Sequence, residues 1–125
     1  MLLDTSVVIE FLRGNASVKT RLQKETVLTI PYVVLGELYL GAYRSANAAK
    51  HGDQIKRFLV NCEVLSADAE TADHYARIKA TLLQKGKPIP ENDIWIAAIA
   101  SQYSLPLVTR DNHFSEIDGL PLERL

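Results

Sequence analysis

The stretch TVLTIPYVVLGELYLGAY, residues 26–43, predicts a strand that leads directly into a helix. Residues 26–30 alternate β-branched side chains, as half-buried strands do. Pro31 fits the first turn of the following helix, because the N–H that proline lacks would have no partner there. Apolar residues then recur at helical spacing on one side of the helix, namely Val34, Leu35, Leu38 and Ala42. Glu37 lies inside this apolar run, where a carboxylate is unusual.

The alternation of strand and helix continues along the rest of the chain. We predict further strands at residues 2–4, 63–65, 105–109 and 122–124, and helices at 5–12, 15–24, 46–60, 69–84 and 91–103. Strands separated by helices are joined by right-handed crossovers and form a mostly parallel sheet covered on both faces. At 125 residues, we expect a single α/β domain over residues 1–125.

Composition narrows the possible environments and partners. The net charge is −1, so no overall basic field points to nucleic acid, although a local basic rim remains possible. Cys62 is the only cysteine, which excludes an intramolecular disulfide and a cysteine-rich zinc site. The start of the chain lacks the features of a signal peptide, and no segment has the roughly 20 apolar residues that span a bilayer. We therefore expect a cytoplasmic protein that does not contact a membrane.

Four carboxylates lie beside apolar runs, not in charged surface stretches: Asp4, Glu37, Asp93 and Asp111. Asp4 and Asp111 follow predicted strands, and open parallel sheets bind ligands beyond the carboxyl ends of their strands. Taken singly, the three aspartates have ordinary alternatives as helix caps or turn residues, and Glu37 as a paired surface residue. Four such placements together instead predict one acidic site.

Carboxylates that gather in this way repel one another, and a hard divalent cation is the usual remedy. We expect Mg²⁺ or Mn²⁺, one or two ions per site, which would activate water and stabilise a leaving oxygen. No cysteine and no closely spaced histidine pair suggests zinc. The polar residues best placed to orient acids or water are Thr5, Ser6, Asn92, Thr109 and Asn112. His113 could support Asp111, while His51 and His74 are interpreted as surface residues.

Four motifs carry a family resemblance: DTS at 4–6, ELYLGA at 37–42, PIPENDIWIAA at 88–98 and LVTRDNHF at 107–114. Their order and spacing over nearly the whole chain resemble the PIN-domain ribonucleases, and in particular the VapC toxins of VapBC toxin–antitoxin pairs. The resemblance implies a PIN-like three-layer α/β/α fold with a five-stranded sheet of order 3-2-1-4-5. It also implies metal-dependent endonucleolytic cleavage of RNA, with Asp4, Glu37 and Asp93 as central acids and Asp111 as a fourth.

The resemblance further implies partners. Such toxins are typically homodimers. A VapB-like antitoxin covers the acidic site, and the toxin contacts DNA only indirectly, through this antitoxin. Basic residues that could form an RNA rim are Arg13, Arg44, Arg110, Lys50 and Lys87, each of which could equally be a solvated surface charge.

Three other interpretations remain. A haloacid-dehalogenase phosphatase would need an aspartate where Ser6 stands, and a receiver domain would need a late lysine where Thr109 and Arg110 stand. The third is a non-catalytic module that binds antitoxin within a DNA-bound repressor complex. Metal-dependent turnover separates an enzyme from such a module.

Overall fold

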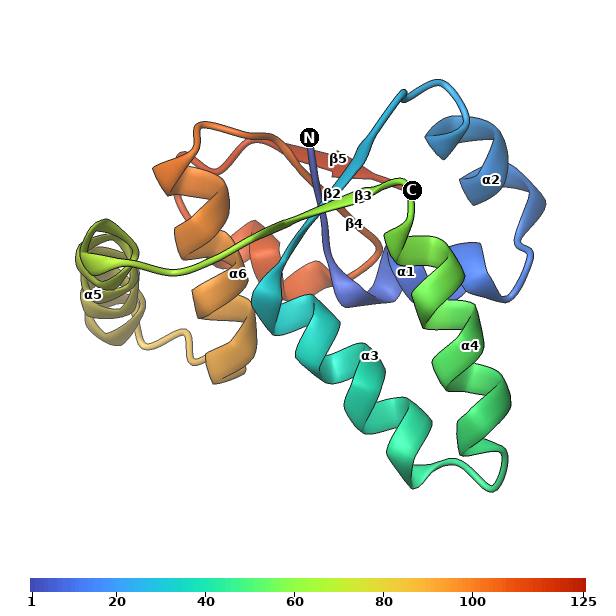
Figure 1. Ribbon diagram of the computed structural model, residues 1–125. Helices are drawn as coiled ribbons and strands as arrows, with labels where there is room; N and C mark the ends of the chain where they lie inside the picture. The colour runs from blue at the N-terminus through green and yellow to red at the C-terminus, as the bar shows by residue number, and fades with distance from the viewer.

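The computed structural model describes residues 1–125 as alternating short strands and helices (Figure 1). The strands are β1 (Leu2–Leu3), β2 (Leu28–Pro31), β3 (Cys62–Leu65), β4 (Leu107–Thr109) and β5 (Leu122–Arg124). The helices are α1 (Thr5–Leu12), α2 (Ala16–Leu22), α3 (Tyr32–Arg44), α4 (Ala48–Leu59), α5 (Ala69–Lys85), α6 (Glu91–Gln102) and the 3₁₀ helix η1 (Asn112–Glu116). The predicted α/β class and all predicted helices are confirmed, and η1 is an element that the sequence did not predict.

The strands pair only in parallel, but they form two sheets instead of the single sheet that was predicted. One sheet has the order β1-β4-β5 and the other pairs β2 with β3. β1 lies beside β2, so the order 3-2-1-4-5 is kept in space without a hydrogen-bonded ladder across the middle. β1 is only two residues long, and the strand that it pairs with is β4.

The core surrounds the short central strands and includes residues of α1, α2, α3, α4 and α6. Leu2, Leu3, Leu107 and Val108 are fully buried in the two adjacent strands. Helix α6 contributes the run Ile96–Ala100, in which no residue is more than 1% exposed. α6 has more buried residues than any other helix.

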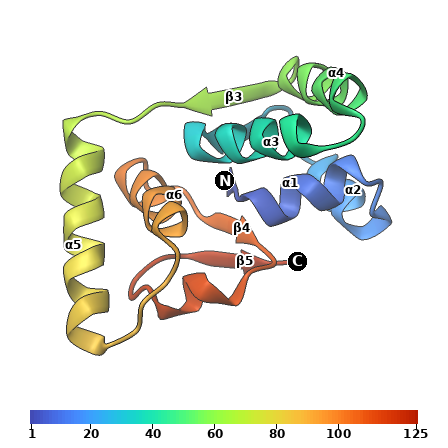
Figure 2. The same ribbon diagram turned by 90° about the horizontal axis from the view of Figure 1, so that it is seen from below.

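Helices lie on both sides of the strands. Figure 1 shows α5 and α6 on one side, α1, α2 and α4 on the other, and the α3–α4 hairpin extending below the strands. Viewed from below, α1, α3 and α6 lie close together next to β4 (Figure 2). Asp4 caps α1, Glu37 lies in α3 and Asp93 lies in α6. None of the helices is both long and apolar enough to cross a membrane.

The start of α3 differs by one residue from the prediction. Pro31 is the last residue of β2, with extended backbone at φ −78° and ψ 155°, and α3 begins at Tyr32. Proline still serves the purpose argued from the sequence, since it needs no N–H partner where strand becomes helix. The direct passage from β2 into α3 places Glu37 in the second turn after the strand end.

Candidate active site

Asp4 is the most deeply buried of the four acids, with only 3% of its surface exposed. It follows β1 directly and caps α1, accepting a hydrogen bond from the Val7 amide at 3.1 Å. Thr5 and Ser6, the next two residues, lie inside the helix. Burial raises the pKa of Asp4 above its usual range, although hydrogen bonds from Thr109 and Ser6 counteract the rise. Asp4 is therefore both a helix cap and a candidate site residue.

Two hydroxyl groups connect Asp4 to the segment that carries Asp111. The Ser6 hydroxyl donates to Asp4 Oδ1 at 2.7 Å and accepts the Arg110 amide at 3.1 Å. The buried Thr109 hydroxyl donates to Asp4 Oδ2 and accepts the Asp111 amide at 2.8 Å. Since both hydroxyls are donor and acceptor at once, they fix the end of β4 against the end of β1. Their placement supports the orienting role expected for Ser6 and Thr109.

Glu37 reaches the site from the middle of α3. The Thr5 hydroxyl donates to Glu37 Oε1 at 2.7 Å, which links the first turn of α1 to the second turn of α3. Glu37 is partly exposed and also borders the clefts on either side of α3. Thr5 is thus the residue that holds this carboxylate toward the other acids.

Asp93 and Asp111 meet at the mouth of the site together with His113. His113 Nδ1 lies 3.1 Å from Asp93 Oδ2 and 3.0 Å from Asp111 Oδ1. Asp111 also caps η1 by accepting the His113 amide at 2.8 Å. Burial, then the charge of Asp111, raises the pKa of Asp93 to about 6, and His113 opposes that rise. No side chain caps α6, so Asp93 is not the simple helix cap that its sequence position allowed.

The structure brings the four predicted acids together. Glu37, Asp93 and Asp111 line one open cleft with Pro90, Glu91, Asn92 and His113. Asp4 lies behind them, and the charge of Asp111 contributes to its raised pKa. The charges of Asp111 and Glu37 likewise contribute to the raised pKa of Asp93. Converging carboxylates are the donor set of a hard divalent cation site. Electrostatic repulsion among them is what such a cation would relieve.

The other predicted polar residues divide into two groups. Asn92 is exposed on the rim of the cleft. Asn112 is directed elsewhere, since its side-chain oxygen accepts a hydrogen bond from Arg124 on β5, and its predicted orienting role finds no geometric support. Glu91 was missed as a cleft residue. It accepts hydrogen bonds from Tyr75 and Lys79 of α5, which no sequence signal indicated.

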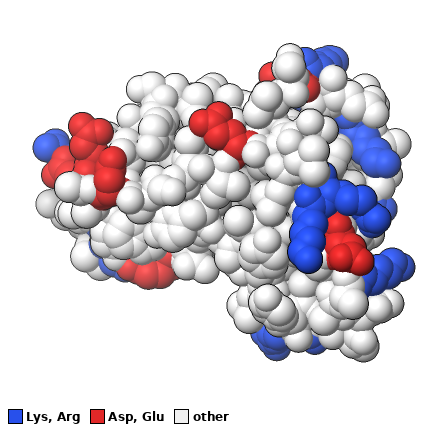
Figure 3. All heavy atoms as spheres, viewed as in Figure 1, with Lys and Arg blue, Asp and Glu red and all other residues white.

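A second groove lies between α1, α3 and α4. It is lined by apolar residues together with Arg13, Lys50 and His51, and Glu37 lines both this groove and the acidic cleft. Figure 3 shows Lys and Arg side chains gathered on the side of the molecule that α4 occupies, whereas the α5 end carries acidic groups. Arg13 also pairs with Glu10 at 3.2 Å, and Arg44 and Arg110 are exposed. Of the basic residues predicted to form a rim, Arg13 and Lys50 line this groove, whereas Arg44, Arg110 and Lys87 do not.

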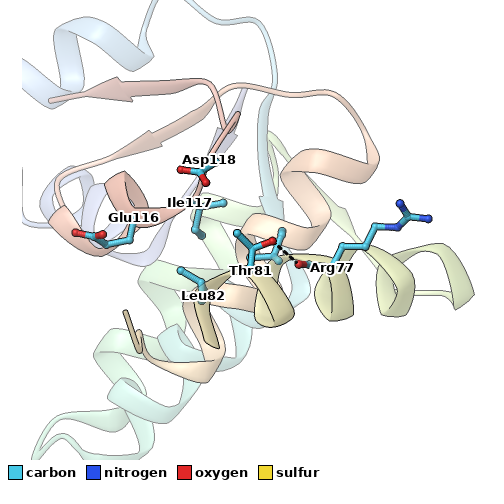
Figure 4. Close-up of a pocket in the computed structure, with 7 residues that line it drawn as sticks. Arg77, Thr81, Leu82, Glu116, Ile117 and Asp118 are labelled. Atoms are coloured by element: carbon cyan, nitrogen blue, oxygen red, sulfur yellow. Dashed lines mark hydrogen bonds between the residues drawn. The ribbon is translucent and has the colours of Figure 1, made fainter. Parts of the chain in front are cut away.

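A separate hollow lies between α5 and the residues that end η1. It is lined by Arg77, Ile78, Thr81, Leu82, Glu116, Ile117 and Asp118. Figure 4 shows the Arg77 guanidinium pointing away from this hollow, and the Thr81 hydroxyl bonding back to the Arg77 carbonyl within α5. None of the four acids lies here, so the cleft at the strand ends remains the candidate site.

Known proteins resemble this chain over nearly its whole length. Residues 1–120 match the PIN domain family. The chain is 34% identical over 125 residues to ribonuclease VapC2 of Haemophilus influenzae, covering 98% of this chain and 95% of the relative. It is 32% identical over 125 residues to the tRNA(fMet)-specific endonuclease VapC of Shigella flexneri, with the same coverage. Among solved structures, DNA-bound VapBC of Salmonella typhimurium superposes with a TM-score of 0.93 at 29% identity, covering 98% of this chain and 96% of that one.

Proposed function

Because the chain belongs to the PIN domain family, and within it to the VapC-type ribonuclease toxins of VapBC pairs, we propose that its acidic cleft hydrolyses RNA phosphodiester bonds with Mg²⁺ or Mn²⁺. The single observation that carries the proposal is the convergence of Glu37, Asp93 and Asp111 on one cleft in front of buried Asp4. A structural role alone would not require four mutually repelling acids in one place.

The donor atoms fit a hard cation, and the residues proposed to hold one or two ions are Asp4, Glu37, Asp93 and Asp111. When bound, such an ion activates water and stabilises charge on the phosphate and leaving oxygens. The chain's own part is to hold the donors in place before substrate arrives. Thr5 holds Glu37, and Ser6 and Thr109 hold Asp4 while fixing the loop of Asp111.

Positive charge near the cleft would receive the RNA backbone. Arg13 and Lys50 line the groove that ends at Glu37, and exposed Arg110 has its amide tied to Ser6. Phosphate contacts position nucleic acid without reading sequence, so these residues would bind many RNAs alike. The Shigella relative cleaves, by its name, tRNA(fMet), which makes an initiator transfer RNA the first defined substrate to test.

A VapB-like antitoxin is proposed as the inhibitor, in a cytoplasmic complex that contacts DNA through the antitoxin. The Salmonella relative was solved as a DNA-bound VapBC complex. Here the groove beside the acids is lined by apolar Leu12, Leu38 and Ile55, and also by the acid Glu37. An antitoxin segment with apolar side chains and a terminal Arg or Lys would complement both features.

A homodimer is also part of the proposal. Leu40 and Tyr43 are 56% and 79% exposed on the same helix, α3, and Tyr39 stacks against Tyr43. Exposed apolar side chains that cluster on one helix are a common feature of subunit interfaces. Light scattering of the free protein should give the mass of a dimer, and Tyr43→Lys should shift it toward the monomer.

Cleavage of total cellular RNA tests the catalytic proposal. Purified protein freed of antitoxin should produce discrete fragments with Mg²⁺ or Mn²⁺ and none with EDTA. Asp4→Asn and Asp111→Asn should be inactive, whereas Asp73→Asn, an exposed acid on α5, should match wild type. If folded wild-type protein leaves both total RNA and tRNA(fMet) intact, the chain acts instead as an antitoxin-binding module.

A further inference from the structure

His113 lies between two of the candidate metal ligands. Its Nδ1 atom is 3.1 Å from Asp93 Oδ2 and 3.0 Å from Asp111 Oδ1. One ligand atom from each of the three residues can be chosen so that all lie within 4.8 Å of one another. Asp93 belongs to α6 and Asp111 caps η1, so the fold brings the two acids together with His113 from segments distant in sequence.

These separations match those of neighbouring ligands in an octahedral shell. Two donors bound about 2.1 Å from one ion at a right angle lie about 3 Å apart. We propose that His113 Nδ1 is itself a metal ligand, next to Asp93 and Asp111, and that it gives the site a preference for Mn²⁺ over Mg²⁺. This inference rests on the proposed metal-dependent ribonuclease function and specifies the ion and one further ligand.

The ring position is set by the local fold. The His113 amide donates to Asp111 Oδ1 at 2.8 Å, which starts η1, and the adjacent Phe114 is fully buried and anchors that turn. The His113 side chain is half exposed, so bound water can reach the remaining coordination positions. The same distances would also suit a hydrogen bond from Nδ1–H to the carboxylates. Coordination requires the other tautomer, with its proton on Nε2.

A nitrogen donor changes which ion the site favours. Mg²⁺ is a hard cation held through oxygen atoms, whereas first-row transition metals also accept imidazole. Losing a group that merely supports a metal ligand already costs about tenfold or more in affinity. Replacing His113 by Gln should therefore weaken Mn²⁺ binding at least tenfold, while Mg²⁺ binding should change much less. His113→Asp should restore binding through oxygen and move the preference toward Mg²⁺.

Electron spin echo spectroscopy of Mn²⁺ bound to the whole protein tests the assignment. Wild type should show coupling of the Mn²⁺ electron spin to a directly bound ¹⁴N, and labelling the histidines with ¹⁵N should change that coupling. The signal should vanish in His113→Asp, which still binds the ion, and persist in His74→Gln on α5. Circular dichroism establishes that each variant is folded.

The outcomes separate this inference from the proposed function. Bound Mn²⁺ and RNA cleavage without nitrogen coupling in wild type would overturn the His113 assignment and leave the ribonuclease intact. Nitrogen coupling that survives in His113→Asp would assign it to another residue and also overturn the inference. Failure of wild type to bind either ion would contradict the metal dependence on which both proposals rest.

Discussion

Asp93 is held in an environment that disfavours its charge. Burial and the neighbouring Asp111 raise its pKa to about 6 in the folded protein without metal, against 3.8 in an unfolded chain. Folding therefore favours the protonated form, so this contribution to stability is fully present below pH 3.8 and is lost as the pH rises through 6. A difference of this size corresponds to roughly 2–3 kcal/mol.

Asp93→Asn should remove that pH dependence. In EDTA, urea unfolding measures the free energy of unfolding of both proteins. Relative to wild type, that of the variant should rise by on the order of 2 kcal/mol between pH 4.5 and pH 7.5. Comparing the two proteins at each pH cancels the titration of groups that do not interact with Asp93. Asp73→Asn is the control and should keep a constant difference from wild type. An Asp93→Asn curve that runs parallel to wild type would show that ionising Asp93 costs the fold little.

The hydroxyl of Thr5 orients the Glu37 carboxylate through a hydrogen bond. It donates a hydrogen bond of 2.7 Å from the start of α1 to the middle of α3. Thr5→Val keeps the shape but removes the donor, and it should lower kcat/KM for RNA roughly 10- to 100-fold, as loss of ligand-supporting groups does. Thr5→Ser retains the hydroxyl and should stay near wild type. Equal activity of the Val and Ser variants would mean that Glu37 is oriented without Thr5.

At the scale of the elements, α5 ends where its sequence indicated. Asp68 caps its start through a reciprocal pair with Thr71, and Gly86 ends it in the left-handed region at φ 65°. Both positions lie outside the acidic cleft, so they govern stability and not chemistry. The helix also carries Tyr75, which stacks on Trp95 of α6 with ring centres 3.9 Å apart. Helix α5 therefore helps to fix α6, whose first turn holds Asp93.

Gly86→Ala should destabilise the protein by about 1 kcal/mol, because an L side chain is strained at positive φ. Gly52→Ala is the matched control, and we expect it to stabilise the protein instead of destabilising it. Gly52 lies inside α4, where nothing occupies the space of an added Cβ, and alanine there should stabilise by about 0.5–1 kcal/mol. Chemical denaturation measures both changes. A neutral Gly86→Ala would show that the end of α5 relaxes into another conformation.

The helices were predictable because their signals are local. Hydrophobic spacing, Asn15, Asp68 and Gly86 mark starts and stops that depend on a few neighbouring residues. The strands are only two to four residues long, and their partners are set by contacts distant in sequence. The pairing of β1 with β4 agrees with the strand order that the family resemblance implied. The sequence did not reveal that β1 forms no ladder with β2, nor that η1 follows Asp111.

The gathering of the acids was predictable at the scale of the whole molecule. Asp4 and Asp111 follow parallel neighbouring strands, so topology alone brings them to one edge. The direction of a surface side chain has no such rule, and Asn112 accordingly turns to Arg124 instead of the acids. The groove of α1, α3 and α4 could not be foreseen either, because it depends on how the α3–α4 hairpin packs against α1.

A bound cation should stabilise the entire fold, because it binds the acids only when α1, α3, α6 and η1 are assembled. At a free concentration one hundred times the dissociation constant, one ion adds about 2.7 kcal/mol. For a domain of this size the melting temperature should then rise by roughly 10 °C. Calorimetry with and without Mn²⁺ measures the shift, and EDTA should reverse it. Asp111→Asn should lose most of the shift, whereas Asp73→Asn should retain it. An equal rise in both variants would place the stabilising ion outside the acidic cleft, since only the first substitution removes one of its ligands.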